Sequence, residues 1–204
     1  MRLMMMGATA LLAVMATTAM AIEEAAYAVE IADDDFELRT YEPQIVAEVV
    51  IKDDFQDAGN RAFRPLFRYI SGDNASREDI AMTAPVSQEK RGEKIAMTTP
   101  VGQRAEADGW AVSFMMPADY TMDTIPEPTD PSVSWREIPP HRMAVVRYSG
   151  RWTERNYVEH LEELQEWVTE QGLQVVGEPV WARYNGPFMP WFMRRNEILL
   201  PIGP

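Results

Sequence analysis

Cysteine is absent from this chain of 204 residues. Its absence excludes disulfide bonds, thiolate metal sites, a cysteine nucleophile and a lipid-modified N-terminal cysteine. Histidine is scarce, since His141 and His160 are the only two. They lie 19 positions apart and lack the local spacing of a zinc site, so zinc is not indicated.

Basic residues are outnumbered. The chain has 19 Lys and Arg against 32 Asp and Glu, which gives a net charge of −13 and a pI near 4.6. A protein that binds a nucleic acid backbone needs a basic face, so this charge argues against nucleic acid as a partner. It also argues against docking on anionic lipid. Solubility is the simplest explanation of the acidity.

Motifs of catalysis are missing too. The sequence contains no glycine-rich phosphate loop, no nucleophile elbow and no H-E-x-x-H. Carboxylates are plentiful, but in so acidic a chain no catalytic pair can be singled out. We therefore expect a protein that is not an enzyme.

Long apolar runs are confined to residues 1–21. Arg2 precedes an apolar stretch, and Ala19 and Ala21 are the small residues that signal peptidase requires. We expect a signal peptide that is cleaved after Ala21, a periplasmic or secreted protein, and one domain over 22–204. The alternative is an uncleaved anchor, because the run is nearly long enough to span a bilayer. After cleavage we expect no stable membrane insertion.

Two helices stand out in the remaining sequence. Apolar residues recur at spacings of three and four over 55–71 and over 153–171. Pro65 predicts a kink or a break in the first helix. Thr153 is the expected N-cap of the second, and Gly172 its stop. Strands are predicted at 45–51, 110–116, 143–148, 180–184 and 197–202.

These elements fall into two halves of the same order, about 36–116 and 143–202. Each half is a strand, a helix and two further strands. A proline-rich connector, 117–140, separates them and is not expected to form a packed element. The sequence thus predicts an α+β fold: an antiparallel sheet, or a distorted β-barrel, with two helices packed on it.

A heptamer occurs twice in the first half, as IAMTAPV at 80–86 and IAMTTPV at 95–101. Long apolar residues alternate with small or polar ones, and a charged loop lies between, so the pair predicts a β-hairpin. Met82 and Met97 then point to the same side. Two interpretations stay open: the methionines line a ligand cavity, for which their flexibility suits them, or they fill the core.

These heptamers resemble the SOUL, or haem-binding-protein, family. The resemblance extends over about 36–202 and includes several motifs in order. They are FRYISGDN at 67–74, FMMP at 114–117 with YT at 120–121, PEP at 126–128, ARYNGP at 182–187 and RRNE at 194–197.

The resemblance implies a distorted antiparallel barrel of two similar halves, and binding of haem or related tetrapyrroles. One difference concerns the iron ligand. In an animal member the proposed axial histidine lies in a stretch similar to residues 37–43, and Thr40 occupies that place here. A threonine hydroxyl is a poor iron ligand, so that ligation cannot be carried over.

Other residues are candidates for holding such a ligand. His160, on the flank of the second helix, and His141, before a strand, could each ligate haem iron, and we take His160 as the candidate metal ligand. Arg194 and Arg195 could meet haem propionates or form an internal ion pair with Glu197.

The segment around Trp191 concentrates large apolar residues, from Phe188 to Met193, between prolines. We expect it to be buried at one end of the barrel, because large apolar residues usually are. If it is exposed, it could close over a flat ligand or dock a partner.

The leading hypothesis is an exported binding protein that holds haem, or another flat tetrapyrrole or amphipathic ligand, without catalysis. The alternative is an envelope interaction or structural domain with no small ligand. The residues taken as candidates for the ligand site are Met82, Met97, His141, His160, Trp191, Arg194 and Arg195.

Overall fold

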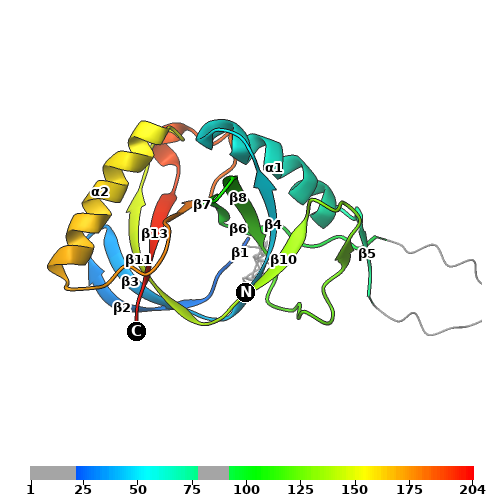
Figure 1. Ribbon diagram of the computed structural model, residues 1–204, viewed down its shortest axis with the longest axis horizontal. Coiled ribbons are helices and arrows are strands. Elements are labelled where there is room, and N and C mark those ends of the chain that lie inside the picture. The colour runs from blue at the N-terminus through cyan, green and yellow to red at the C-terminus, as the bar shows by residue number, and fades with distance from the viewer. Residues whose placement is uncertain (1–21, 78–91) are drawn as a thin grey trace, which may run out of the picture.

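The computed structural model describes residues 22–77 and 92–204. Within them a curved antiparallel sheet carries two helices on one side (Figure 1). The helices are α1 (Phe55–Ile70) and α2 (Glu154–Glu170), with a short 3-10 helix, η1 (Trp191–Met193). The strands are β1 (Glu23–Glu24), β2 (Tyr27–Asp33), β3 (Phe36–Tyr41), β4 (Gln44–Ile51), β5 (Asn74–Ala75), β6 (Thr98–Thr99), β7 (Val101–Glu106), β8 (Gly109–Met115), β9 (Glu127–Pro128), β10 (Ser134–Ile138), β11 (His141–Tyr148), β12 (Val180–Arg183) and β13 (Asn196–Ile202).

Nine strands form the main sheet in the order β10-β4-β8-β7-β12-β13-β11-β3-β2. The order shows the two halves. β4, β8 and β7 with α1 correspond to β11, β13 and β12 with α2, and the halves join where β7 pairs with β12. The strand that precedes each half pairs with the other half: β3, which comes before β4, pairs with β11, and β10, which comes before β11, pairs with β4. The sheet ends at β10 and β2, so it is a half-barrel, and the predicted α+β fold with two helices is confirmed.

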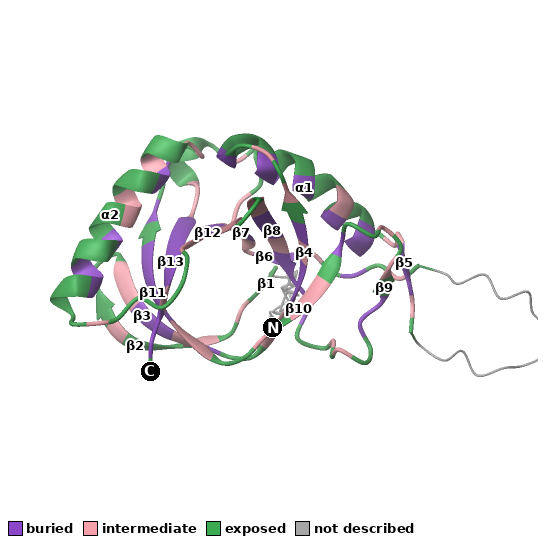
Figure 2. Cartoon of the chain, viewed as in Figure 1, coloured by how far each residue is buried: buried purple, intermediate pink, exposed green. Residues whose placement is uncertain are grey.

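Both helices pack on the convex side of the sheet. α1 lies against β4 and β8, and α2 lies against β11 and β13. Each helix buries one apolar face: Ala62, Leu66 and Tyr69 in α1, and Leu164 and Trp167 in α2. The outer faces remain exposed (Figure 2). This one-sided burial is what apolar spacings of three and four produce.

The helix boundaries follow local rules. The Asp54 carboxylate accepts hydrogen bonds from the backbone N–H groups of Gln56 and Asp57 at the start of α1, and Thr153 caps α2 as predicted. Gly172, just after α2, has a φ of 66°, a conformation that suits glycine. Of the two predicted effects of Pro65, a kink or a break, the break is absent, since α1 is helical throughout Phe55–Ile70.

The strands present different side chains to their two sides. In β11, Ala144 and Val146 join the core beneath α2, whereas Met143 and Val145 face the concave side. Successive side chains of a strand point to opposite faces, so every strand contributes to both surfaces. The concave surface is therefore built from the residues that the helices do not cover.

The prediction that 117–140 forms no packed element is wrong for much of its length. β10 lies within it and pairs with β4 along five residues, from Ser134 to Ile138. Ile125 and Val133 are buried beneath α1. The polar, proline-rich composition led to this wrong prediction because β10 is an edge strand. Edge strands tolerate charged residues, and prolines can stand next to them in the sequence.

The heptamer pair is only partly described, because 80–86, with Met82, lies outside the described residues. The prediction that 95–101 forms one strand is wrong. Thr98–Thr99 forms β6, which pairs with β1, and the separate strand β7 begins at Val101. Pro100 has no N–H to donate, which interrupts the ladder between them.

A core prediction follows for α1. Replacing Leu66, which is fully buried, with alanine should lower the free energy of unfolding by about 2–5 kcal/mol, because it removes apolar contacts and leaves a cavity. The neighbouring Phe67→Ala is the matched control, since Phe67 is 49% exposed. Urea unfolding followed by circular dichroism measures both, and equal midpoints for the two variants would contradict the packing of α1.

Candidate functional site

The concave side of the sheet holds a cavity of about 110 Å³. Its apolar wall includes Met115, Met143 and Leu199, which come from three different strands. Five polar or charged side chains line the same space: Tyr41, Arg104, Arg136, His141 and Tyr184. An apolar wall with a few polar groups converging on it is the usual composition of a small-molecule site.

His141 begins β11 and lines this cavity. Its ring stacks on Tyr41, with centroids 5.4 Å apart and planes 11° from parallel. Its Nδ1 lies 2.8 Å from the carbonyl oxygen of Pro139. A carbonyl only accepts, so Nδ1 must carry the hydrogen, and in the neutral ring Nε2 keeps a free lone pair. That tautomer is the one a metal-ligating histidine needs.

Two arginines lie at the side of the cavity formed by β7 and β10. Arg136 donates from Nε and Nη2 to one oxygen of Glu48, at 3.1 Å each. Arg104 lies 3.5 Å from the same oxygen and also pairs with Glu106. The side chains of Arg104 and Arg136 are 27% and 39% exposed, so both can reach a further anion.

A buried charge network lies at the opposite side of the concave face. Its centre is Glu197 on β13, whose side chain is fully buried. The carboxylate accepts from Arg39 Nη1 at 2.9 Å, Arg195 Nε at 3.0 Å and the Tyr184 hydroxyl at 2.7 Å. Arg195 also pairs with Glu24 at 2.9 Å. The network joins β1, β3, β13 and the segment after β12.

This network shifts several pKa values. Burial by itself would raise the pKa of Glu197, but the hydrogen bonds and charge of Arg39 and the charge of Arg195 outweigh it, so the pKa lies below its ordinary value. Burial raises the pKa of Tyr41 to about 12, and burial and Glu197 raise the pKa of Tyr184. Both phenols therefore stay protonated at neutral pH and are poor ligands for a metal.

The two histidines lie on opposite sides of the sheet. His160 is on α2, where Nδ1 is 2.8 Å from Glu163 and the ring centroid is 4.2 Å from that of Tyr148. It does not line the concave cavity, whereas His141 does. Met97 packs against the core cluster beneath α1. The structure thus brings His141, and neither His160 nor Met97, to the cavity.

The two candidate arginines near the C-terminus, Arg194 and Arg195, make different contacts. Arg195 forms the internal ion pair with Glu197 described above. Arg194 donates to the carbonyl oxygens of Met189 and Pro187, at 2.8 Å each, and lies 4.1 Å from the ring centroid of Trp152. Neither lines the cavity. Thr40 is also outside it, with its hydroxyl hydrogen-bonded to Glu30.

The prediction that the segment from Phe188 to Met193 is buried is wrong. Phe188 is 99% exposed, Trp191 49%, Phe192 61% and Met193 62%. The convex core beneath α2 is filled by side chains of the sheet and the helix themselves, with Trp152 at its margin. The segment therefore lies outside the core, near the start of α2, where the backbone N–H of Gly150 donates to the carbonyl oxygen of Trp191 (Figure 1).

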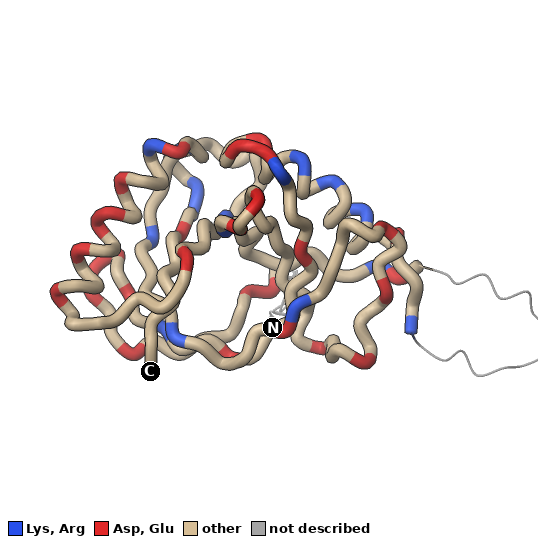
Figure 3. Tube along the Cα trace, viewed as in Figure 1, with Lys and Arg blue, Asp and Glu red and all other residues tan. Residues whose placement is uncertain are grey.

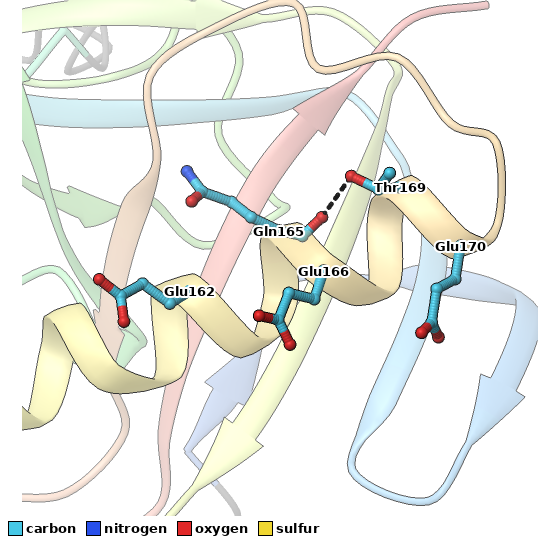
Figure 4. A pocket seen from close by; sticks show the side chains of 5 residues that line it. All are labelled: Glu162, Gln165, Glu166, Thr169 and Glu170. Carbon is cyan, nitrogen blue, oxygen red and sulfur yellow. Dashed lines mark hydrogen bonds between the residues drawn. The ribbon is translucent and has the colours of Figure 1, made fainter.

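A second hollow, of about 510 Å³, lies on the outside of α2. Its lining is Glu162, Gln165, Glu166, Thr169 and Glu170, all from one exposed helix face (Figure 4). Figure 3 shows acidic residues spaced along the same helix. Three carboxylates on an open surface repel an acidic ligand, so the concave cavity is the better candidate.

Sequence reasoning missed several residues of the cavity, among them Tyr41, Arg104, Met115, Arg136 and Met143. The alternation within each strand divides residues between two faces, but it does not say which face the helices cover. Tyr184 could have been selected as a candidate from the sequence, because it lies within the ARYNGP motif of the family resemblance.

Comparison with known proteins identifies the family. The SOUL heme-binding protein family matches residues 22–201. The chain belongs to this family, as its motifs predicted. The family is one of binding proteins, and its name suggests haem or tetrapyrrole ligands.

Solved structures share the fold. A hydrolase from Listeria innocua matches with a TM-score of 0.57 and 12% identity, over 85% of this chain and 94% of that one. The EcmrR C-terminal domain matches with a TM-score of 0.55 and 14% identity, over 82% and 96%. At such identities the likeness shows the fold alone.

No curated protein sequence matches this chain. Among the residues that the structure describes, no helix has the length and apolar character needed to cross a membrane.

The buried network predicts a pH dependence. Glu197→Gln should lower the free energy of unfolding at pH 7 by about 3 kcal/mol, because it leaves the buried Arg39 without its main counter-charge. In the parent chain the folded pKa of Glu197 is lowered. Its contribution is therefore full at neutral pH and is lost as the pH falls below about 4.5.

Urea unfolding at pH 7 and at pH 3.5 measures this effect, and the difference between parent and variant should shrink at the lower pH. Glu137→Gln is the matched control, because Glu137 is exposed on β10. A difference that stays constant with pH would contradict a charged, paired Glu197.

Proposed function

We propose that this protein binds a flat amphipathic acid, with haem or a related tetrapyrrole as the leading case, on the concave face of the half-barrel. The observation that carries the proposal is His141. It lies on the cavity with Nδ1 tied to a backbone carbonyl, beside an apolar wall and two partly exposed arginines. Binding without turnover is the role that this arrangement supports.

The donor set fits such a ligand. Haem supplies an iron that takes an axial nitrogen and propionates that carry negative charge. His141 would offer Nε2 to the metal, and Arg104 and Arg136 would meet the carboxylates by exchanging part of their pairing with Glu48. Met115 and Met143 would contact the flat apolar surface.

The size of the cavity sets the mode of binding. A volume of about 110 Å³ is below the roughly 300–1,000 Å³ of pockets that enclose drug-sized ligands. A tetrapyrrole would therefore lie across the open concave face with one edge toward solvent. Such a site suits carriage or buffering, where the ligand must also leave. Export through the leader at 1–21 would place this activity in the periplasm or outside the cell.

Haemin titration of the protein without its leader tests the proposal. We expect a saturable Soret shift at micromolar haemin. His141→Ala should weaken binding at least about tenfold, the equivalent of about 1.4 kcal/mol, and should change the ligand-field spectrum. His160→Ala is the matched control, because His160 lies on the outer helix and should leave the spectrum unchanged. No saturable change, or equal effects of the two variants, would contradict the proposal.

The arginines can be tested separately with a neutral ligand. The double variant Arg104→Ala/Arg136→Ala should weaken binding of haemin by about tenfold, the loss of two charge-assisted contacts, and should leave haemin dimethyl ester unaffected. Arg155→Ala, on the exposed first turn of α2, is the control. An equal loss for acid and ester would show that these arginines do not recognise carboxylates.

The exposed segment around Trp191 favours a second candidate, an envelope interaction domain that carries no small ligand. The small volume of the concave cavity agrees with it. A silent haemin titration would favour this candidate.

A further inference from the structure

The segment Pro187–Met193, which we call the apolar loop, joins β12 to β13 and is unlike the rest of the surface. It contains only apolar residues, and four of its side chains are at least 49% exposed: Phe188, Trp191, Phe192 and Met193. Phe188, at 99%, touches almost nothing else in the protein. Large exposed apolar groups that gather in one place usually mark a contact surface.

The apolar loop is firmly held. Arg194 donates to the carbonyl oxygens of Pro187 and Met189, and the backbone N–H of Gly150 donates to that of Trp191 at 3.0 Å. Inside the loop, the N–H of Met193 donates to Pro190 at 2.9 Å. Four of its carbonyl groups are thus already used, and it offers little backbone for pairing with a strand. It presents side chains in a fixed arrangement.

Arg151 and Arg194 contact the apolar loop although the chain as a whole is acidic. The loop and its flanking segments, 147–155 and 183–195, contain six arginines and one acidic residue, Glu154. The arginines are Arg147, Arg151, Arg155, Arg183, Arg194 and Arg195. The start of α1 lies in the same region, because Phe55 stacks on Tyr157 at 5.1 Å, and it adds Asp53, Asp54 and Asp57. Arg147, Arg151 and Arg155 are exposed, and the guanidinium of Arg151 lies 5.7 Å from the ring centroid of Trp191.

We propose that the apolar loop docks this protein on the surface of an anionic phospholipid bilayer. Phe188, Trp191, Phe192 and Met193 enter the interface, and Arg151 and Arg155 contact the headgroups. Aromatic rings favour the level of the headgroups, and long basic side chains beside them reach anionic phosphates. The contact is peripheral and inserts no helix.

The net charge of −13 does not forbid this contact. At physiological ionic strength the Debye length is about 8 Å, so charges beyond the docking end are largely screened from the membrane. Many of the acids lie along α2, which runs away from the apolar loop, and a smaller group lies at the start of α1 (Figures 1 and 3). The expectation that the acidity argues against docking on anionic lipid rested on the charge of the whole chain, whereas this contact depends on the charges near the loop.

Vesicle co-sedimentation of the protein without its leader tests the proposal, with vesicles of phosphatidylcholine alone and of phosphatidylcholine with phosphatidylglycerol. We expect binding to the mixed vesicles, weaker binding to the neutral ones, and a decrease at 0.5 M salt. Phe188→Ser/Phe192→Ser should reduce partitioning by about tenfold for each ring removed from the bilayer. Both side chains are exposed, so the thermal unfolding of the variant should match the parent.

The matched control is Phe67→Ser/Val176→Ser, which removes two apolar side chains that are 49% and 59% exposed but lie outside the apolar loop. It should bind vesicles as the parent does. Arg151→Glu/Arg155→Glu should abolish the preference for phosphatidylglycerol and leave binding to neutral vesicles unchanged.

Several results would overturn the proposal: no binding to either vesicle, binding that the Phe188/Phe192 variant retains, or an equal loss in the control.

Self-association is an alternative use of the same surface. A sedimentation-velocity dimer that disappears in the Phe188/Phe192 variant, with no vesicle binding, would assign the loop to a second copy of the chain. The vesicle assay contains no haemin, so its outcome is independent of ligand binding on the concave face.

Discussion

The buried carboxylate of Glu197 fixes the geometry of the concave face. It lies on β13 and is bonded to Arg39 on β3, to Arg195 just before β13 and to the Tyr184 hydroxyl after β12. Removing a carboxylate from water costs several kcal/mol, and only close, hydrogen-bonded cations offset that cost. The strands that carry these groups must therefore keep their register, and the shape of the surface beside the cavity follows from it.

The exchange of strands between the halves has a related effect. β3 belongs to the first half in sequence but pairs with β11 of the second, and β10 does the reverse. Arg39 thus reaches Glu197 from the other half, and Arg136 on β10 reaches Glu48 on β4 in the same way. Both polar clusters of the concave face depend on this exchange. The cavity between them is a product of two halves that cannot form it separately.

Sequence patterns located the helices and five strands of the main sheet, β4, β8, β11, β12 and β13, because their signals are local. The spacing of apolar residues, the cap at Thr153 and the stop at Gly172 all act within a few positions. β10 was missed because an edge strand needs only one neighbour and tolerates the prolines around it. The second heptamer was misread as one strand, since alternation continues through Pro100 although the ladder does not.

The candidate site was harder to predict, because it depends on which face of the sheet the helices cover. His141 and His160 were equivalent in the sequence, yet one lines the concave cavity and the other lies on α2. The apolar loop was expected to be buried because its residues are hydrophobic. Hydrophobicity indicates a preference for burial, but it does not show whether the core has space for the side chains. That space was already filled by Trp181, Phe55 and their neighbours.

The sequence by itself determined the family, the two helices and the repeated order of the halves, since each rests on motifs or periodicity within one segment. Only the tertiary structure decided the site. Strand pairing over long distances brings Arg39 to Glu197 and His141 to Met115, and helix packing leaves one face of the sheet open. These relations depend on contacts between residues distant in the chain, which no local pattern records.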